Sequence, residues 1–229
     1  MDIALFSMGG LQFILRWIHF LSGVTWIGTL YYFNFIQGPY FNEIDAPTKT
    51  QGQAKLLSRA MWWFRWGAML TFISGICYLG MPPMVFNNSR GILILAGATL
   101  GTIMFLNVWL IIWPAQKIVI ASAEGVLKGQ PGNPAAAAAG ARGLLASRTN
   151  TLFSFPMLFF MGAASHLGIR VNPMFNPWPL VIVLGVIIGA LELNAIKGKL
   201  GPMTTIRGVI HMGIVLALVL YGVVEFLTK

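Results

Sequence analysis

Three histidines are the residues of this chain with the most informative chemistry, because each lies in an apolar segment: His19, His166 and His211. An ionisable side chain is costly inside a membrane, so each such histidine indicates a functional site. A glycine lies one helical turn from every histidine, at Gly23, Gly162 and Gly208. Residues three or four apart share a helix face, so these glycines leave room for a flat group beside the imidazole. A neutral imidazole is a good iron ligand, and we therefore predict a bound haem.

Two arginines support the haem prediction, because each lies one turn from a histidine. Arg16 precedes His19 by three residues, and Arg170 follows His166 by four. Guanidinium groups at these positions would face the haem propionates in charge-assisted contacts. Two other interpretations stay open: the arginines snorkel to the membrane surface, and each histidine only forms a hydrogen bond with a neighbouring helix. The single cysteine excludes a CxxCH site for covalent attachment, so the expected cofactor is haem b.

The composition indicates the elements that must position these residues. The chain has 229 residues, of which 57% are hydrophobic and only 9% are charged, and this is outside the range of ordinary soluble domains. About 20 apolar residues are needed for each membrane crossing. Six segments meet this requirement, at about 11–33, 62–81, 91–113, 151–168, 178–195 and 205–226. We therefore predict an all-α integral membrane protein, a single domain over residues 1–229 with a bundle of about six transmembrane helices.

The positions of lysine and arginine predict the orientation of this bundle. They gather in the first, third and fifth connections, at Lys49, Lys55, Arg59, Lys117, Lys128, Arg142, Arg148, Lys197 and Lys199. The second and fourth connections carry only Arg90 and Arg170. Positive residues favour the cytoplasmic side, so we expect both termini on the periplasmic side of a bacterial inner membrane. The net charge of +9 then reflects topology, with lipid rather than nucleic acid as the partner.

His19 and His166 are the pair that we expect to ligate one iron, because they lie at similar depth. At 1.5 Å per residue, His19 lies roughly 6 Å and His166 roughly 9 Å to the outer side of the middle of their segments. His211 lies to the inner side of the middle of the last segment. It stays open as the opposing ligand, as a proton-relay group or as a packing residue.

Two local patterns give further expectations. Asn133-Pro134, followed by an alanine run to about Leu145, predicts an N-cap, a proline at the first helical position and a short separate helix. Cys77 lies in the middle of an apolar segment, and we expect it to pack as a small buried side chain.

Four sequence motifs are spread over most of the chain. They are Arg16-Trp17-x-His19-x-x-x-Gly23-x-x-Trp26-Ile27-Gly28, Asn107-Val108-Trp109-x-x-Ile112-Trp113-Pro114, Ala146-Ser147-Arg148-Thr149-Asn150-Thr151, and Pro156-Met157-Leu158-Phe159-Phe160-Met161-Gly162-Ala163-Ala164-Ser165-His166. In these motifs the chain resembles the membrane domain of the bacterial urate hydroxylase family. The resemblance implies a membrane enzyme of purine catabolism that oxidises urate to 5-hydroxyisourate and passes electrons to a cytochrome c.

Full-length members of that family carry a C-terminal cytochrome c domain on the periplasmic side. This sequence lacks that domain, so we expect a separate cytochrome c or another redox protein as the acceptor. Urate is an anion, and the candidates for holding it are Arg148 and Asn150. Helix capping and anchoring at the cytoplasmic surface are the alternative roles of these two residues. A pocket near Arg16, Asn107 or Arg170 also stays open, and the sequence identifies no catalytic residue.

Two other functions remain as alternatives. The chain could be a non-catalytic or redox accessory subunit of a larger membrane complex, which would agree with the lack of a soluble catalytic domain. It could also be a metal or solute permease, since similar histidine-bearing first helices occur in copper-resistance membrane proteins. We favour the permease less, because the spans contain no methionine-rich or histidine-rich relay.

Overall fold

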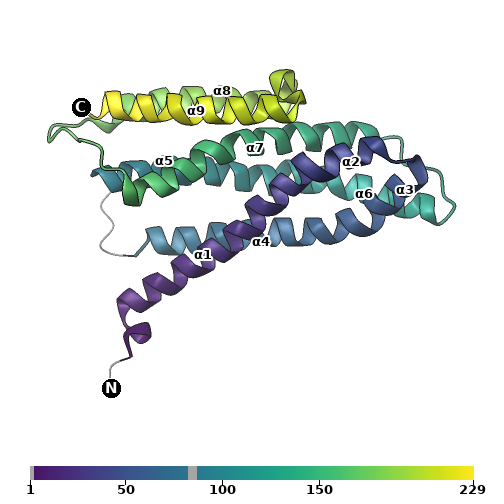
Figure 1. Cartoon of the computed structure of the whole chain (residues 1–229), viewed down its shortest axis with the longest axis horizontal. Helices are drawn as coiled ribbons and strands as arrows, with labels where there is room; N and C mark the ends of the chain where they lie inside the picture. Colours follow the sequence, from purple (N-terminus) through teal and green to yellow (C-terminus); the bar gives the residue numbers. More distant parts are fainter. Residues whose placement is uncertain (1–2, 82–86) are drawn as a thin grey trace. The chain divides into compact units, whose positions relative to one another are not determined.

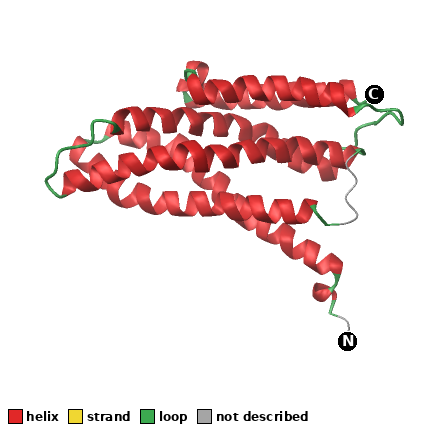
Figure 2. Cartoon of the chain, turned by 180° about the vertical axis from the view of Figure 1, so that it is seen from behind, coloured by secondary structure: helices red, strands yellow, loops and turns green. Residues whose placement is uncertain are grey.

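The computed structural model describes residues 3–81 and 87–229 of the chain, and this part consists of helices and connecting loops without any strand (Figures 1 and 2). The long helices are α1 (Met8–Tyr31), α4 (Ser58–Leu79), α5 (Ser89–Asn107), α6 (Trp113–Leu127), α7 (Ala136–His166), α8 (Pro177–Lys197) and α9 (Ile206–Leu227). The short helical segments are η1 (Ala4–Phe6), α2 (Gly38–Glu43), α3 (Ala46–Gln51) and η5 (Gly201–Thr204). Three further segments are π-helices, η2 (Tyr32–Gln37), η3 (Gly52–Leu57) and η4 (Val108–Ile112).

The prediction of an all-helical protein is confirmed for the described residues, and their apolar helices agree with a membrane protein. Four helical runs are long and apolar enough to cross a membrane: Met8–Glu43, Ser89–Leu127, Pro177–Lys197 and Ile206–Leu227. Each of the six predicted spans overlaps a long helix, although the span 11–33 runs from α1 into η2 and the span 91–113 runs from α5 through η4 to the first residue of α6. The count of six crossings and the side on which the termini lie stay predictions.

Local sequence signals set where several helices begin. The Oγ of Ser7 accepts a hydrogen bond from the Gly10 backbone at 3.1 Å and caps α1. Asn176 caps α8 in the same way, with Pro177 at the first helical position. Thr205 caps α9 by accepting from the Gly208 backbone at 3.0 Å. These caps satisfy backbone N–H groups that an apolar surrounding would leave without a partner.

The chain divides into two compact units, and each has its own helix packing. Unit 1 comprises Met1–Met81 and Phe105–Ser147, and unit 2 comprises Pro82–Met104 and Arg148–Lys229. The prediction that the chain is a single domain is not tested by this division.

In unit 1, α1 packs closely against α4. A Cβ atom at Gly67 of α4 would lie only 3.1 Å from the backbone nitrogen of Trp26, so a glycine permits the close approach. A hydrogen bond of 3.0 Å from the Thr71 hydroxyl to that of Ser22 joins the two helices. Phe72 of α4 stacks on Phe105 with ring centroids 4.1 Å apart. This contact holds α4 against the chain that leads into η4.

In unit 2, α9 packs on α7, and α8 and α9 run side by side in both views (Figures 1 and 2). A Cβ atom at Gly213 of α9 would lie 2.5 Å from the Phe155 ring of α7. Many large apolar side chains of α8 and α9 are exposed, as the lipid-facing surface of a membrane helix requires. They include Val181, Ile182, Val186, Leu193, Val215, Leu218 and Phe226.

Two sequence predictions about local structure are wrong. The alanine run does not form a short separate helix, because α7 continues without a break from Ala136 to His166. The helix begins at Ala136, two residues after Pro134, and Asn133 Oδ1 accepts from the Ala135 backbone at 2.9 Å in the turn before it. Cys77 is exposed on α4 rather than buried.

Candidate functional site

His19 lies on α1 and is hydrogen-bonded to α4, within unit 1. Its Nδ1 atom lies 2.9 Å from the carbonyl oxygen of Thr71. The hydroxyl oxygen of Ser74 lies 3.3 Å from the same nitrogen. The Ser74 hydroxyl itself donates to the Leu70 carbonyl at 2.6 Å, so its oxygen is free to accept from the histidine ring.

These contacts fix the tautomer of the His19 ring. A carbonyl oxygen only accepts hydrogen bonds, so Nδ1 must carry the proton that it shares with Thr71. In the neutral ring the lone pair then lies on Nε2. Histidines that ligate a metal commonly donate from their other nitrogen to a backbone carbonyl, which orients the ring and raises its basicity. With Nδ1 bonded in this way, Nε2 of His19 is the atom that would hold a haem iron.

A second glycine, in addition to Gly23 of the sequence prediction, lies beside the His19 ring. A Cβ atom at Gly75 of α4 would lie 3.1 Å from Cε1 of His19 and 3.3 Å from Nδ1. At Gly23 the nearest described atom to a Cβ would be the Thr71 methyl carbon at 3.9 Å, so the space expected there is present too. Thr71, Ser74 and Gly75 have the i, i+3, i+4 spacing of one helix face. This spacing of small residues in the sequence could have indicated that α4 contributes Thr71, Ser74 and Gly75 to the site.

His166 and His211 both lie in unit 2, and both are exposed. His166 is the last residue of α7, and a Cβ at the neighbouring Gly162 would meet nothing within 4 Å. The space expected beside His166 is therefore present. Beside His211 it is not, because a Cβ at Gly208 would collide with the Pro202 carbonyl oxygen. Gly208 serves the N-terminal turn of α9. Whether His166 or His211 opposes His19 stays a prediction.

The two arginines proposed to face haem propionates are both exposed. The Arg16 guanidinium carbon lies 5.0 Å from the centre of the Tyr78 ring, a cation–π contact between α1 and α4 within unit 1. Arg170 lies in the loop after α7. Within the described ranges 3–81 and 87–229, no cluster of three or more His, Cys, Asp or Glu side chains could hold a metal ion. A haem held by two histidines does not require such a cluster.

A group of polar side chains is buried on and near the π-helices of unit 1. Asn34 and Gln37 of η2 are 2% and 6% exposed, and Asn107 directly precedes η4. Asn34 Oδ1 and Gln37 Oε1 have no hydrogen-bond partner among the residues that the structure describes. π-helical turns are rare and occur often at functional sites. Asn107 was a candidate from the sequence, whereas Asn34 and Gln37 were missed, although their i, i+3 spacing in an apolar segment was an available signal.

Arg148 and Asn150 lie in the middle of α7, so the alternative that they cap the helix is wrong. Arg148 is 7% exposed and Asn150 is fully buried. Asn150 Nδ2 donates to the Met104 carbonyl of α5 at 2.9 Å, a contact within unit 2. Nε and Nη1 of Arg148 have no hydrogen-bond partner in the described part of the chain.

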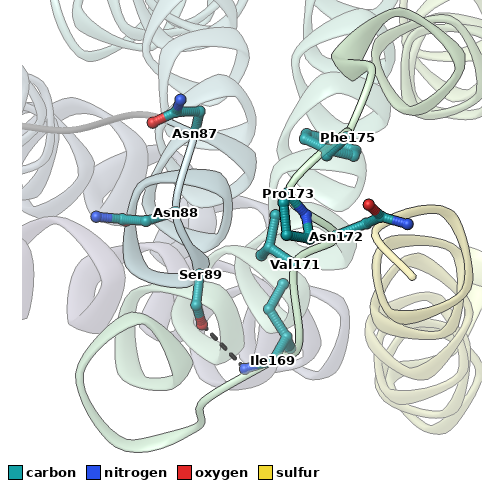
Figure 3. Close-up of a pocket in the computed structure, with 8 residues that line it drawn as sticks. All are labelled: Asn87, Asn88, Ser89, Ile169, Val171, Asn172, Pro173 and Phe175. Carbon is teal, nitrogen blue, oxygen red and sulfur yellow. Dashed lines mark hydrogen bonds between the residues drawn. The ribbon is translucent and has the colours of Figure 1, made fainter.

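Unit 2 also has a cavity of about 340 Å³ at the start of α5 and the loop after α7 (Figure 3). It is lined by Asn87, Asn88, Ser89, Ile169, Val171, Asn172, Pro173 and Phe175. Two of its polar side chains already accept hydrogen bonds from the backbone. Ser89 Oγ accepts from the Ile169 nitrogen at 2.9 Å, and Asn88 Oδ1 accepts from the Gly91 nitrogen at 2.8 Å. No candidate site residue lines this cavity.

Residues 83–221 match the family described as urate oxidase N-terminal. The chain belongs to this family. The match covers 139 of the 229 residues, about three fifths of the chain, and includes His166, His211 and Arg148. His19 and the π-helix η2 lie before the matched range. Comparisons with curated proteins and with solved structures found no match.

Proposed function

We propose that this chain is a membrane oxidoreductase that acts on urate and binds a b-type haem through His19. Membership of the urate oxidase N-terminal family supports the urate part of this proposal. The haem part depends on one observation, the 2.9 Å contact from His19 Nδ1 to the Thr71 carbonyl. That contact holds the ring in the tautomer that offers Nε2 to a metal.

The residues of the chain have distinct roles in this proposal. His19 binds the iron, Thr71 and Ser74 orient its ring, and Gly75 gives the ring its space against α4. That His166 is a second ligand, and that Arg16 and Arg170 contact the propionates, stay predictions from the sequence. When bound, the haem supplies a one-electron acceptor. Oxidation of urate to 5-hydroxyisourate takes an oxygen from water and releases electrons and protons, and the proposed final acceptor is a periplasmic cytochrome c.

The first experiment is the visible spectrum of the purified full chain. We expect the bands of a reduced low-spin b-type haem after dithionite, and we expect His19→Ala to abolish them. Thr29→Val is a matched control on α1, because within the described residues the Thr29 hydroxyl donates to carbonyls of its own helix, those of Thr25 at 2.7 Å and Trp26 at 3.0 Å. A colourless wild-type protein, or a His19→Ala protein with an unchanged spectrum, would refute the haem proposal.

The second experiment replaces dithionite with urate. We expect urate to reduce the haem of the wild-type protein under anaerobic conditions, and added cytochrome c to reoxidise it. A haem that is reduced by dithionite but inert to urate would favour a redox accessory subunit of a larger membrane complex. The two experiments thus test the cofactor and the substrate separately.

A further inference from the structure

Arg148 is the most deeply buried cation among the residues that the structure describes. It lies in the middle of α7 and is 7% exposed. Neither its Nε atom nor its Nη1 atom has a hydrogen-bond partner among the described residues. A guanidinium stays protonated in proteins and carries five N–H donors. Burying such a group without partners is strongly unfavourable. Burying Arg148 therefore lowers the free energy of unfolding, and packing alone does not explain why this arginine is there.

The rest of the described chain offers no buried anion to balance this charge. Five of the six acidic residues lie in the described ranges, and none of them is buried: Glu43, Asp45, Glu124, Glu192 and Glu225. Glu225 pairs with Lys229 at 3.0 Å. Arg16 and Arg65 rest on the aromatic rings of Tyr78 and Trp113, but Arg148 has no such contact within the described ranges. Among the described residues, no buried carboxylate is therefore available to balance the charge of Arg148.

The neighbours of Arg148 on α7 show that its surroundings are polar. Thr149, Asn150 and Thr151 are all fully buried. Asn150 is held in place by its 2.9 Å bond to the Met104 carbonyl of α5. A run of buried polar residues in the middle of a long helix is unusual for a lipid-facing segment and typical of a ligand-binding one.

We propose that Arg148 binds a small organic anion in the interior of the protein. A lipid phosphate also presents negatively charged oxygens, but its headgroup stays at the membrane surface. The Arg148 side chain, in contrast, is more than nine-tenths buried. The anion is urate, which is a monoanion at neutral pH, and this identification depends on the proposed function. Charge-assisted bonds from the guanidinium to the urate oxygens and ring nitrogens would satisfy the unpaired donors.

Binding is tested on the detergent-solubilised full chain by equilibrium dialysis with labelled urate, together with the melting temperature with and without urate. Neither measurement depends on haem reduction. We expect Arg148→Met to weaken urate binding by at least about 30-fold and Arg148→Lys to weaken it less. Arg142→Met is the matched control, because Arg142 is an exposed arginine on the same helix. We expect this variant to bind urate as the wild type does.

The melting temperature without urate excludes a merely structural role. Removing an unpaired buried charge relieves its desolvation cost, so we expect Arg148→Met to melt at the same temperature as the wild type or higher. A lower melting temperature combined with unchanged urate binding would overturn the proposal. Arg148→Lys keeps the charge and serves as a second test if Arg148→Met does not fold.

Two ligand comparisons complete the test. Xanthine is uncharged in mildly acidic buffer while urate remains an anion, and we expect it to bind much more weakly than urate. Arg148-dependent binding of phosphatidylglycerol, without any binding of urate, would overturn the proposal. Urate binding that requires Arg148, in a protein whose haem urate does not reduce, would refute the proposed function and leave this inference standing.

Discussion

Asn34 Nδ2 donates a hydrogen bond of 2.8 Å to Oγ of Ser147, joining the π-helix η2 to α7 within unit 1. The same nitrogen donates to the Leu30 carbonyl at 2.9 Å, which fixes the orientation of the amide. The Asn34 oxygen is thereby turned to a buried position without a partner in the described residues. Gln37 Oε1 is in the same situation one turn later. η2 thus holds two buried hydrogen-bond acceptors that remain available.

The Asn34–Ser147 bond is testable with a double-mutant cycle. We expect Asn34→Ala and Ser147→Ala to show a coupling free energy of about 1 kcal/mol, because each removes one end of the same buried hydrogen bond. Reversible unfolding in mixed micelles measures this quantity. The control pairs Asn34→Ala with Thr99→Ala, an exposed position on α5, and should give no coupling. Additive effects of Asn34→Ala and Ser147→Ala would contradict the bond.

Gly75 is predicted to be needed for the position of the His19 ring. A valine there would place its Cβ 3.1 Å from Cε1 of His19 and add further atoms, so the ring must move away from the Thr71 carbonyl. We expect Gly75→Val to lower stability by about 1–3 kcal/mol and to reduce the haem content of the purified protein. Gly28→Ala on α1 is the control, because its Cβ would meet nothing within 4 Å. Full haem content in Gly75→Val would place the cofactor elsewhere.

Gly213 is predicted to set the approach of α9 to α7 in unit 2. A larger side chain would overlap the Phe155 ring, which lies 2.5 Å from the position of a Cβ. We expect Gly213→Leu to lower the free energy of unfolding by about 1–3 kcal/mol through overpacking. Gly222→Ala on the same helix should have little effect, since its Cβ would be in open space. Equal melting temperatures of the two variants would be inconsistent with this packing.

Asp45 is predicted to make the start of α3 sensitive to acid. Its carboxylate caps the helix, and hydrogen bonds from the side chain and backbone of Thr48 hold the pKa of Asp45 below its ordinary value. A carboxyl whose pKa is lowered on folding contributes stability above its unfolded pKa and loses it as the pH falls through the folded pKa. The protection of residues 46–51 from hydrogen exchange should therefore fall as the pH drops below the ordinary pKa of an aspartate. Asp45→Asn keeps a capping oxygen and should remove this pH dependence.

The helices could be predicted from the sequence because apolar runs determine them directly. Each predicted span overlaps a long helix, and His19 was singled out as an ionisable group among apolar neighbours. The α7 helix was predicted too short for a physical reason. Its residues Ser147 to Asn150 are polar, and polar residues usually mark the end of a membrane span. Here they are buried, which only the tertiary structure shows.

The half of the site on α4 could not be predicted from His19 alone. The partner of the His19 ring is a backbone carbonyl, that of Thr71, and every residue has such a carbonyl. Which carbonyl bonds the His19 ring depends on how α1 and α4 pack. Gly67, four residues before Thr71 on α4, permits that close packing. The π-helices were also missed, because one added residue hardly changes the apolar pattern of a long helix.

The π-helical segments have a consequence for how this chain tolerates changes in length. Each one accommodates a residue more than regular α-helical spacing allows. Deleting one residue from Tyr32–Gln37 would let η2 relax to the ordinary period, while turning Asn34 by about 100° relative to the helix on its C-terminal side. Insertion or deletion of one residue in a π-helical segment therefore changes the direction of buried side chains without interrupting the helix. They give evolution a way to remodel the interior of the protein while the membrane spans stay intact.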